Sequence, residues 1–129
     1  MMSDWNPTQK ALQLAGTTET ALIGDSVYSL FARTLKVARG KGRGDVNYES
    51  AAVQAVVSEF LQPYLSDEEI LLFRRGRNNS RMRVPRNCRA LDYRHATGLE
   101  YLLGTLYLSG QRNRLRELFE LMEKALQEE

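Results

Sequence analysis

Residues 96–108 read ATGLEYLLGTLYL, and this stretch decides the fold. Its apolar residues recur at helical spacing and predict a buried helix from about residue 91 to residue 108, ending at Gly110. The one charged side chain in the stretch is Glu100. A carboxylate on a buried helix face costs several kcal/mol unless something compensates it, so Glu100 is a candidate functional residue.

A second apolar helical stretch, residues 21–28 (ALIGDSVY), also contains a single carboxylate, Asp25. Small residues lie close to both acids: Gly24 precedes Asp25, and Gly98 and Gly104 flank Glu100. Because glycine lets two helix backbones approach closely, we expect these helices to pack through buried faces and to bring the two carboxylates into one site.

The other segments also have helical rather than alternating periodicity, which predicts an all-α fold in one domain spanning residues 1–129. A short helix is expected from Asn6-Pro7 to near Gly16, and a capping box at Ser66 opens another. Longer helices are expected at about residues 18–38 and 47–61 and near the C-terminus. Their predicted apolar surfaces are Leu22, Ile23, Val27, Leu30, Phe31 and Leu35 in the first, Ala51, Ala52, Ala55, Val56 and Phe60 in the second, and Leu115, Leu118, Phe119, Met122 and Leu126 in the last.

Composition narrows the class of protein. The chain is 43% apolar and 26% charged, as in globular proteins, and no apolar run approaches the roughly 18 residues of a membrane span. The N-terminus lacks the pattern of a secretory signal, and Cys88 is the only cysteine, so we expect a reducing compartment, the cytoplasm.

Basic residues are concentrated in one region although the net charge is only +2. Between residues 74 and 94 there are eight arginines and one acid, Asp92. Guanidinium groups with asparagine and serine side chains suit phosphates and 2′-hydroxyls, and few aromatic residues are available for stacking on single strands. A solvated loop is the alternative interpretation. The residues predicted to contact duplex RNA are Arg75, Arg77, Asn78, Arg81, Arg83 and Arg86.

A divalent cation would explain the two isolated carboxylates. Mg²⁺ binds one or two protein carboxylates and keeps several waters, so we expect Asp25 and Glu100 to be both metal ligands and catalytic residues acting on a phosphodiester. The alternative is that each acid is solvated or paired with a basic residue. Because His95 and Cys88 occur singly, no histidine-and-cysteine metal motif is present, and we expect His95 to be a packing residue.

These motifs together resemble the Mini-III branch of the ribonuclease III family. Residues 21–28 resemble the family's Gly-Asp helix motif, and Arg75-Gly76-Arg77-Asn78 with Pro85-Arg86-Asn87 resembles the basic segment of the small branch. Residues 93–108 (YRHATGLEYLLGTLYL) resemble the second signature, in which the glutamate is a metal ligand. The resemblance covers nearly the whole chain.

The resemblance implies a helical endonuclease domain that forms a homodimer and cuts double-stranded RNA with Mg²⁺, leaving 5′-phosphate and 3′-hydroxyl ends. It implies that Asp25 and Glu100 of each protomer form one metal centre, without a separate RNA-binding domain. The expected substrate is the stem that joins the ends of the large-subunit ribosomal RNA precursor, with a ribosomal protein as a further candidate partner. Apolar residues of the first long helix and residues 101–108 are the expected dimer contacts.

The chain departs from the family pattern at four positions. Larger relatives have acidic residues where Thr18, Ala21 and Thr97 stand, and the small branch has one where Ser29 stands. Because of these departures, we expect fewer acidic side chains around the metal than in those relatives. Ser29 and Thr97 favour the rival interpretation of a non-catalytic RNA-binding or ribosome-assembly protein. A third interpretation, a protein-interaction module, would use the acidic last helix.

Overall fold

The computed structural model describes residues 7–40, 47–79 and 83–127, which form six α-helices and one short 3₁₀ helix. In chain order these are α1 (Pro7–Leu14), α2 (Thr17–Arg39), α3 (Ala51–Leu61), η3 (Gln62–Tyr64), α4 (Asp67–Arg77), α5 (Ala90–Leu108) and α6 (Arg112–Ala125). No strand occurs in the described ranges, so the predicted all-α class is confirmed.

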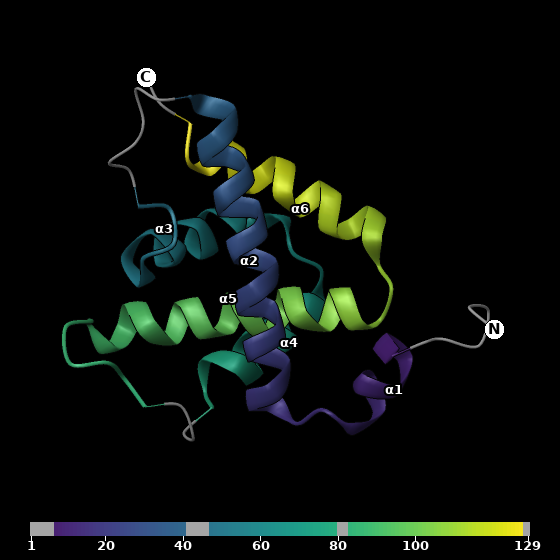
Figure 1. Ribbon diagram of the computed structural model, residues 1–129. Helices are drawn as coiled ribbons and strands as arrows, with labels where there is room; N and C mark the ends of the chain where they lie inside the picture. The colour runs from purple at the N-terminus through teal and green to yellow at the C-terminus, as the bar shows by residue number, and fades with distance from the viewer. Residues whose placement is uncertain (1–6, 41–46, 80–82, 128–129) are drawn as a thin grey trace.

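Helix α5 is the centre of the fold. Figure 1 shows α2 crossing in front of α5, with α3 and α6 on one side of it and α4 behind the crossing. The largest fully buried apolar side chains include Leu99, Leu102, Leu103 and Leu106 of α5, which pack with Tyr28 of α2. The predicted helix at residues 91–108 therefore holds the core together, as expected from its apolar run.

Local signals in the sequence set several helix ends. Gly40 ends α2 with φ of 83°, a conformation that glycine adopts without strain. At the start of α4, the Ser66 hydroxyl accepts from the Glu69 N–H and the Glu69 carboxylate accepts from the Ser66 N–H, which confirms the predicted capping box. The helix expected at residues 47–61 begins only at Ala51, because Ser50 is its N-cap and its hydroxyl accepts from the Val53 N–H.

The predicted apolar surfaces were partly wrong. In α3, Val56 and Phe60 are exposed, and the buried face is formed by Gln54, Val57 and Leu61 with Ala55 and Ser58. This helix is apolar around almost its whole circumference, so its periodicity does not select one face. In α2, Leu22 and Leu30 are likewise exposed, whereas Phe31 and Leu35 are buried as predicted.

Close approach of α2 and α5 is made possible by glycine, as predicted. A Cβ on Gly24 would lie 1.6 Å from the backbone oxygen of Glu100, and one on Gly104 would lie 2.1 Å from the backbone oxygen of Thr20. Gly98 approaches Phe73 of α4 in the same way, since a Cβ on Gly98 would lie 2.8 Å from the phenyl ring. These contacts place the start of α2 directly against the middle of α5.

An ion pair connects α4 to α6. The Arg114 guanidinium donates to both oxygens of Glu69 at 2.8 Å and to the backbone oxygen of Tyr64. Glu69 is buried, and the hydrogen bond from Arg114 is the main cause that lowers the pKa of its carboxyl. This ion pair fixes the beginning of the helix whose other end carries the arginine-rich segment.

Most of residues 101–108, which were expected to be dimer contacts, are buried within the chain, although Tyr107 is exposed. Tyr101, Leu102, Leu103, Leu106 and Leu108 are buried inside the single chain, because they form the core face of α5. The outer side of α2 does expose Leu22, Leu30 and Val37. In the part of the chain that the structure describes, no helix combines the length and apolar character needed to cross a membrane.

Candidate active site

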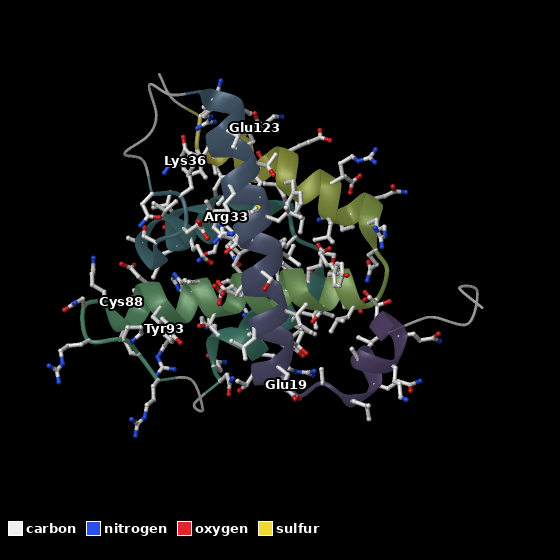
Figure 2. The ribbon with its side chains drawn as sticks, viewed as in Figure 1. Glu19, Arg33, Lys36, Cys88, Tyr93 and Glu123 are labelled. Carbon is white, nitrogen blue, oxygen red and sulfur yellow. The ribbon has the colours of Figure 1, made fainter. Side chains whose placement is uncertain are left out.

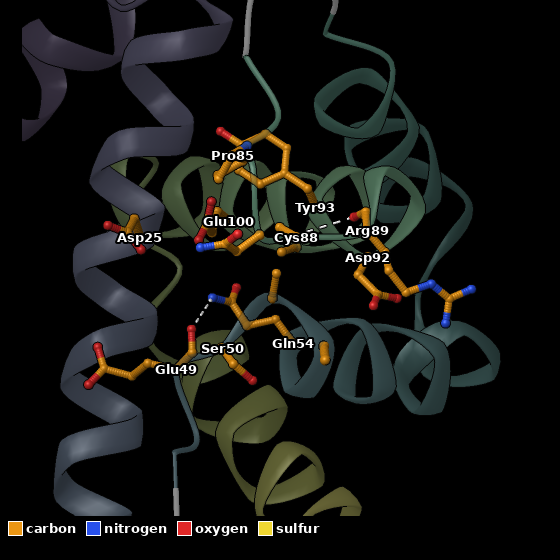
Figure 3. A pocket seen from close by; sticks show the side chains of 14 residues that line it. Asp25, Glu49, Ser50, Gln54, Pro85, Cys88, Arg89, Asp92, Tyr93 and Glu100 are labelled. Carbon is orange, nitrogen blue, oxygen red and sulfur yellow. Dashed lines mark hydrogen bonds between the residues drawn. The ribbon is translucent and has the colours of Figure 1, made fainter.

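Asp25 and Glu100 line the same pocket, a cavity of about 510 Å³. Its walls come from α2, the start of α3, the first half of α5 and residues 85–89 (Figure 3). Figure 2 shows Cys88 and Tyr93 near the start of α5, with Arg33 and Lys36 further along α2. The lining residues with polar side chains are Asp25, Glu49, Ser50, Gln54, Asn87, Cys88, Arg89, Asp92, Tyr93 and Glu100.

Glu100 is the less exposed acid of the pair, and its side chain is partly buried. The pKa of its carboxyl is raised to about 8. Burial is the largest cause, and the charge of Asp25 and a side-chain hydrogen bond with Asp25 act in the same direction. A hydrogen bond with Gln54 acts in the opposite direction. In the absence of a cation, the site therefore holds a proton at neutral pH.

Asp25 is exposed, which corrects the expectation that both carboxylates lie on buried helix faces. The neighbouring Gly24 occupies the α2 position that contacts α5, and Asp25, one residue further along the helix, lies at the edge of the contact. The site therefore has one carboxylate open to solvent and one that is partly buried.

Neither acid is paired with a basic residue in the described ranges. The ion pairs there join Arg33 to Glu49, and Arg114 to Glu69 and Glu117. Figure 3 shows the Glu49 carboxylate directed away from Glu100. It accepts a hydrogen bond from Ser29 at 2.7 Å and lies 3.6 Å from the Arg33 guanidinium. The Glu49 carboxylate therefore interacts with these two side chains and is not part of the acid pair.

Gln54 is the third polar group at the base of the pocket. Its side chain is 4% exposed, and its Nε2 donates to the backbone oxygen of Glu49 at 3.2 Å. Its Oε1 is buried and has no hydrogen-bond partner. A buried acceptor without a partner is rare in proteins, and it often indicates a functional role or the place of an ion or a water molecule.

The donors around the pocket fit a hard, hydrated cation. Among the described residues no group of three or more histidine, cysteine, aspartate or glutamate side chains is arranged to hold a metal. Four of the described carboxylates line the pocket, but Glu49 is held by Ser29 and Arg33. Figure 3 shows Asp92 beside Arg89, away from Glu100. Asp25, Glu100 and the orphaned amide oxygen remain, which is the sparse oxygen set that Mg²⁺ accepts while keeping several waters. A structural zinc site of cysteine and histidine does not fit, because Cys88 is the only donor of that type in the pocket wall. His95 instead packs against Phe73, with ring centroids 6.0 Å apart.

The predicted RNA-binding residues lie at the end of α4 and on the following segment. Arg75 donates to the Tyr101 hydroxyl at 3.3 Å, and Arg77 donates to the Asn78 side-chain oxygen at 3.2 Å. Arg83 and Arg86 are exposed, whereas Arg81 lies outside the described residues. None of the five described residues lines the pocket, so the structure does not bring them into contact with the acid pair.

The sequence alone led to no site role for several residues that line the pocket. Arg89 and Asn87 extend the basic segment into the pocket wall, and Asp92 and Tyr93 follow on the first turn of α5. Gln54 carried a signal that was available: it is the one polar residue in the apolar run AAVQAVV at residues 51–57. This is the same signal that identified Asp25 and Glu100.

Comparison with known proteins identifies the family. Residues 19–111 match the Ribonuclease III domain. Mini-ribonuclease 3 of Clostridium tetani is 34% identical over 122 residues, covering 89% of this chain and 81% of the relative. Mini-ribonuclease 3 of Thermoanaerobacter sp. is 40% identical over 114 residues, covering 84% of this chain and 80% of the relative.

A solved structure supports the fold. The crystal structure of a protein from Fusobacterium nucleatum is similar to this chain with a TM-score of 0.74 and 21% sequence identity, covering 91% of this chain and 98% of the other. At that identity the likeness concerns the fold alone. From the domain match and the sequence relatives, the chain belongs to the ribonuclease III family of endoribonucleases.

Proposed function

We propose that this chain is a Mg²⁺-dependent endoribonuclease for double-stranded RNA, in which Asp25 and Glu100 are the metal ligands and catalytic residues. One observation carries the proposal: the two carboxylates face one pocket, interact with each other, and have no basic partner among the described residues. Two carboxyl groups held together without a basic partner, one of them with a raised pKa, are expected where a cation binds in place of the proton.

The chemistry is hydrolysis of a phosphodiester. When bound, the cation would neutralise charge on the phosphate and lower the pKa of a bound water molecule. Asp25 and Glu100 orient the reacting groups, and the exposed position of Asp25 leaves the pocket open to a bulky polymer. Attack of water on phosphorus with departure of the 3′-oxygen leaves a 5′-phosphate and a 3′-hydroxyl.

The arginine-rich segment would hold the substrate. We assign phosphate contacts near the cut to Arg75, Arg77 and Asn78, and contacts further along the duplex to Arg81, Arg83 and Arg86. The exposed guanidinium groups of Arg83 and Arg86 support this assignment, since phosphates need accessible donors. The name of the relatives, Mini-ribonuclease 3, supports RNA as the substrate. We further propose, from the family resemblance, a precursor of ribosomal RNA as the substrate, the cytoplasm as the compartment and a ribosomal protein as a helper.

A homodimer would provide one centre for each strand. The exposed leucines of α2, Leu22 and Leu30, with Val37 on the same helix, are the apolar contacts that support it. Sedimentation of the parent protein at micromolar concentration should show a dimer, and Leu30→Lys should shift it toward a monomer. A parent protein that stays monomeric contradicts this part of the proposal.

The test of the reaction uses two matched substitutions. Asp25→Asn and Glu100→Gln should each abolish Mg²⁺-dependent cleavage of duplex RNA while circular dichroism stays that of the parent. Glu120→Gln, an exposed acid on α6, is the control and should cleave normally. Cleavage by Asp25→Asn at the parent rate would rule out the proposed role.

The rival function is RNA binding without catalysis. Two observations favour it: the Thr97 hydroxyl is buried and donates to the Tyr93 backbone oxygen at 2.9 Å, and Ser29 donates to Glu49. Both stand where relatives with a fuller metal shell have acids. This function predicts duplex binding without Mg²⁺ and no cleavage at any Mg²⁺ concentration.

A further inference from the structure

Gln54 lies at the base of the pocket that contains Asp25 and Glu100, yet it takes no part in the proposed reaction. We propose that Gln54 is a positioning residue of the metal site, whose side-chain oxygen accepts a hydrogen bond from the hydration shell of the bound cation. This inference rests on the proposed function and extends it from two carboxylates to a third, uncharged group.

The first argument is the cost of Gln54 in its position. The residue is 4% exposed and belongs to the buried face of α3 together with Val57 and Leu61. An apolar side chain there would avoid desolvating an amide, and Oε1 gains no hydrogen bond within the chain in return. A buried acceptor of this kind is compensated when a ligand supplies the donor.

The second argument is the orientation of the amide. Nε2 donates to the backbone oxygen of Glu49 at 3.2 Å, which fixes which end of the amide faces that carbonyl. A flipped amide would place Oε1 opposite the Glu49 oxygen, so two acceptors would face each other. Figure 3 shows the amide between this carbonyl, joined by the dashed line, and the Glu100 side chain.

The third argument is complementarity with a hydrated cation. Two carboxylates leave several water molecules on Mg²⁺, and each of these waters has O–H donors that need acceptors. On the solvent side, bulk water provides them beside the exposed Asp25. On the buried side of the pocket, Oε1 of Gln54 is a free acceptor. Such outer groups orient the ligands of a metal and strengthen its binding.

The experiment measures cation affinity without RNA, by titration calorimetry with Mn²⁺ as the probe. Gln54→Met keeps the length of the side chain and removes its acceptor, and it should weaken Mn²⁺ binding by about 10- to 100-fold. Its denaturation midpoint without metal should fall only slightly, because Oε1 had no partner and the amide loses only the hydrogen bonds of Nε2, to the Glu49 backbone oxygen and to Glu100. If Gln54 had only a structural role, Gln54→Met would lower the denaturation midpoint strongly and leave the Mn²⁺ affinity unchanged.

The control is Gln62→Met. Gln62 directly follows α3, the helix that carries Gln54, and does not line the pocket. Its Nε2 donates to the Ser58 backbone oxygen at 3.0 Å. The Gln62→Met protein should bind Mn²⁺ with the affinity of the parent. Gln54→Glu keeps an acceptor in place and should bind Mn²⁺ at least as tightly as the parent, which decides the case if Gln54→Met does not fold.

The outcomes separate this inference from the proposed function. Parent-like Mn²⁺ affinity in Gln54→Met, or weakened affinity in Gln54→Glu, overturns the role of Gln54 while parent cleavage continues to depend on the cation. A parent protein that neither binds Mn²⁺ nor cleaves duplex RNA with it overturns the proposed function, and the role of Gln54 with it.

Discussion

Gly24 of α2 and Glu100 of α5 are in direct main-chain contact: a Cβ on Gly24 would lie 1.6 Å from the backbone oxygen of Glu100. The contact joins the residue before one candidate metal ligand to the other ligand itself. The separation of the two carboxylates is therefore set by the packing of two backbones, and the site depends on a residue that has no side chain.

Gly24→Ala should destabilise the fold and the site together. A methyl group in that contact forces α2 and α5 apart, and overpacking against backbone is expected to lower the free energy of unfolding by about 3 kcal/mol. Urea denaturation measures this loss, and Mn²⁺ titration should show weakened binding. Gly16→Ala is the matched control, because a Cβ there meets only the Glu19 carboxylate at 3.7 Å and should cost about 1 kcal/mol as a changed N-cap. Equal stabilities of the two variants would contradict the prediction.

Without metal, stability should fall as pH rises between about 5 and 8. Burial and the neighbouring Asp25 raise the pKa of Glu100 from 4.5 to about 8, so across this window the folded protein holds a proton that the unfolded chain has released. The contribution of Glu100 to the free energy of unfolding then decreases by at most about 1.4 kcal/mol for each pH unit. Urea titrations in a chelator measure the slope.

Two comparisons isolate Glu100 as the source of that slope. Glu100→Gln should flatten it, because no proton is released on unfolding. Saturating Mg²⁺ should flatten it as well, since the cation replaces the proton, and Mg²⁺ affinity should rise with pH up to about 8. A slope that persists in Glu100→Gln assigns the effect to another group.

Arg114→Ala should cost about 3 kcal/mol of stability, because it leaves the buried Glu69 carboxylate unpaired. Pairing lowers the pKa of Glu69, so its stabilising contribution is present above its ordinary pKa of 4.5 and is lost as pH falls through the lowered value. Glu117→Ala removes only the exposed partner of Arg114 and should change stability by less than about 1 kcal/mol. Chemical denaturation of both variants at pH 7 tests the difference.

Arg75→Ala and Arg77→Ala should weaken RNA binding in a way that depends on salt. If each guanidinium contacts one phosphate, each substitution should reduce the slope of log affinity against log salt concentration by about 1. Binding of a duplex by the Asp25→Asn protein, which should not cleave it, is measured over a range of salt. Arg116→Ala on α6 is the control and should leave the slope unchanged.

The sequence predicted the helices well because their ends carry local chemistry. Gly40, the Ser66 capping box and the apolar run ending before Gly110 act through neighbouring atoms, so their effect is readable without the fold. The buried face of α3 was not predicted correctly, because that face is chosen by contacts with α5 and α6 and not by the pattern of a helix that is apolar nearly all round.

The site was predictable to the extent that isolated polar residues in apolar runs identify it. Asp25 and Glu100 were recognised by this signal, and the glycines beside them indicated close helices. The exposure of Asp25 followed from the rotation of α2 on α5, which a sequence does not specify. Gln54 has the same signal, but an uncharged amide attracts less notice than a carboxylate, and its missing hydrogen bond is visible only in three dimensions.

A pair of ligands spaced by main-chain contact has a practical consequence for engineering. Arg83 and Arg86, which do not line the pocket, can be substituted to change the proposed RNA contacts, because neither sets the distance between Asp25 and Glu100. In the proposed function, RNA selectivity and phosphodiester cleavage can therefore be altered separately.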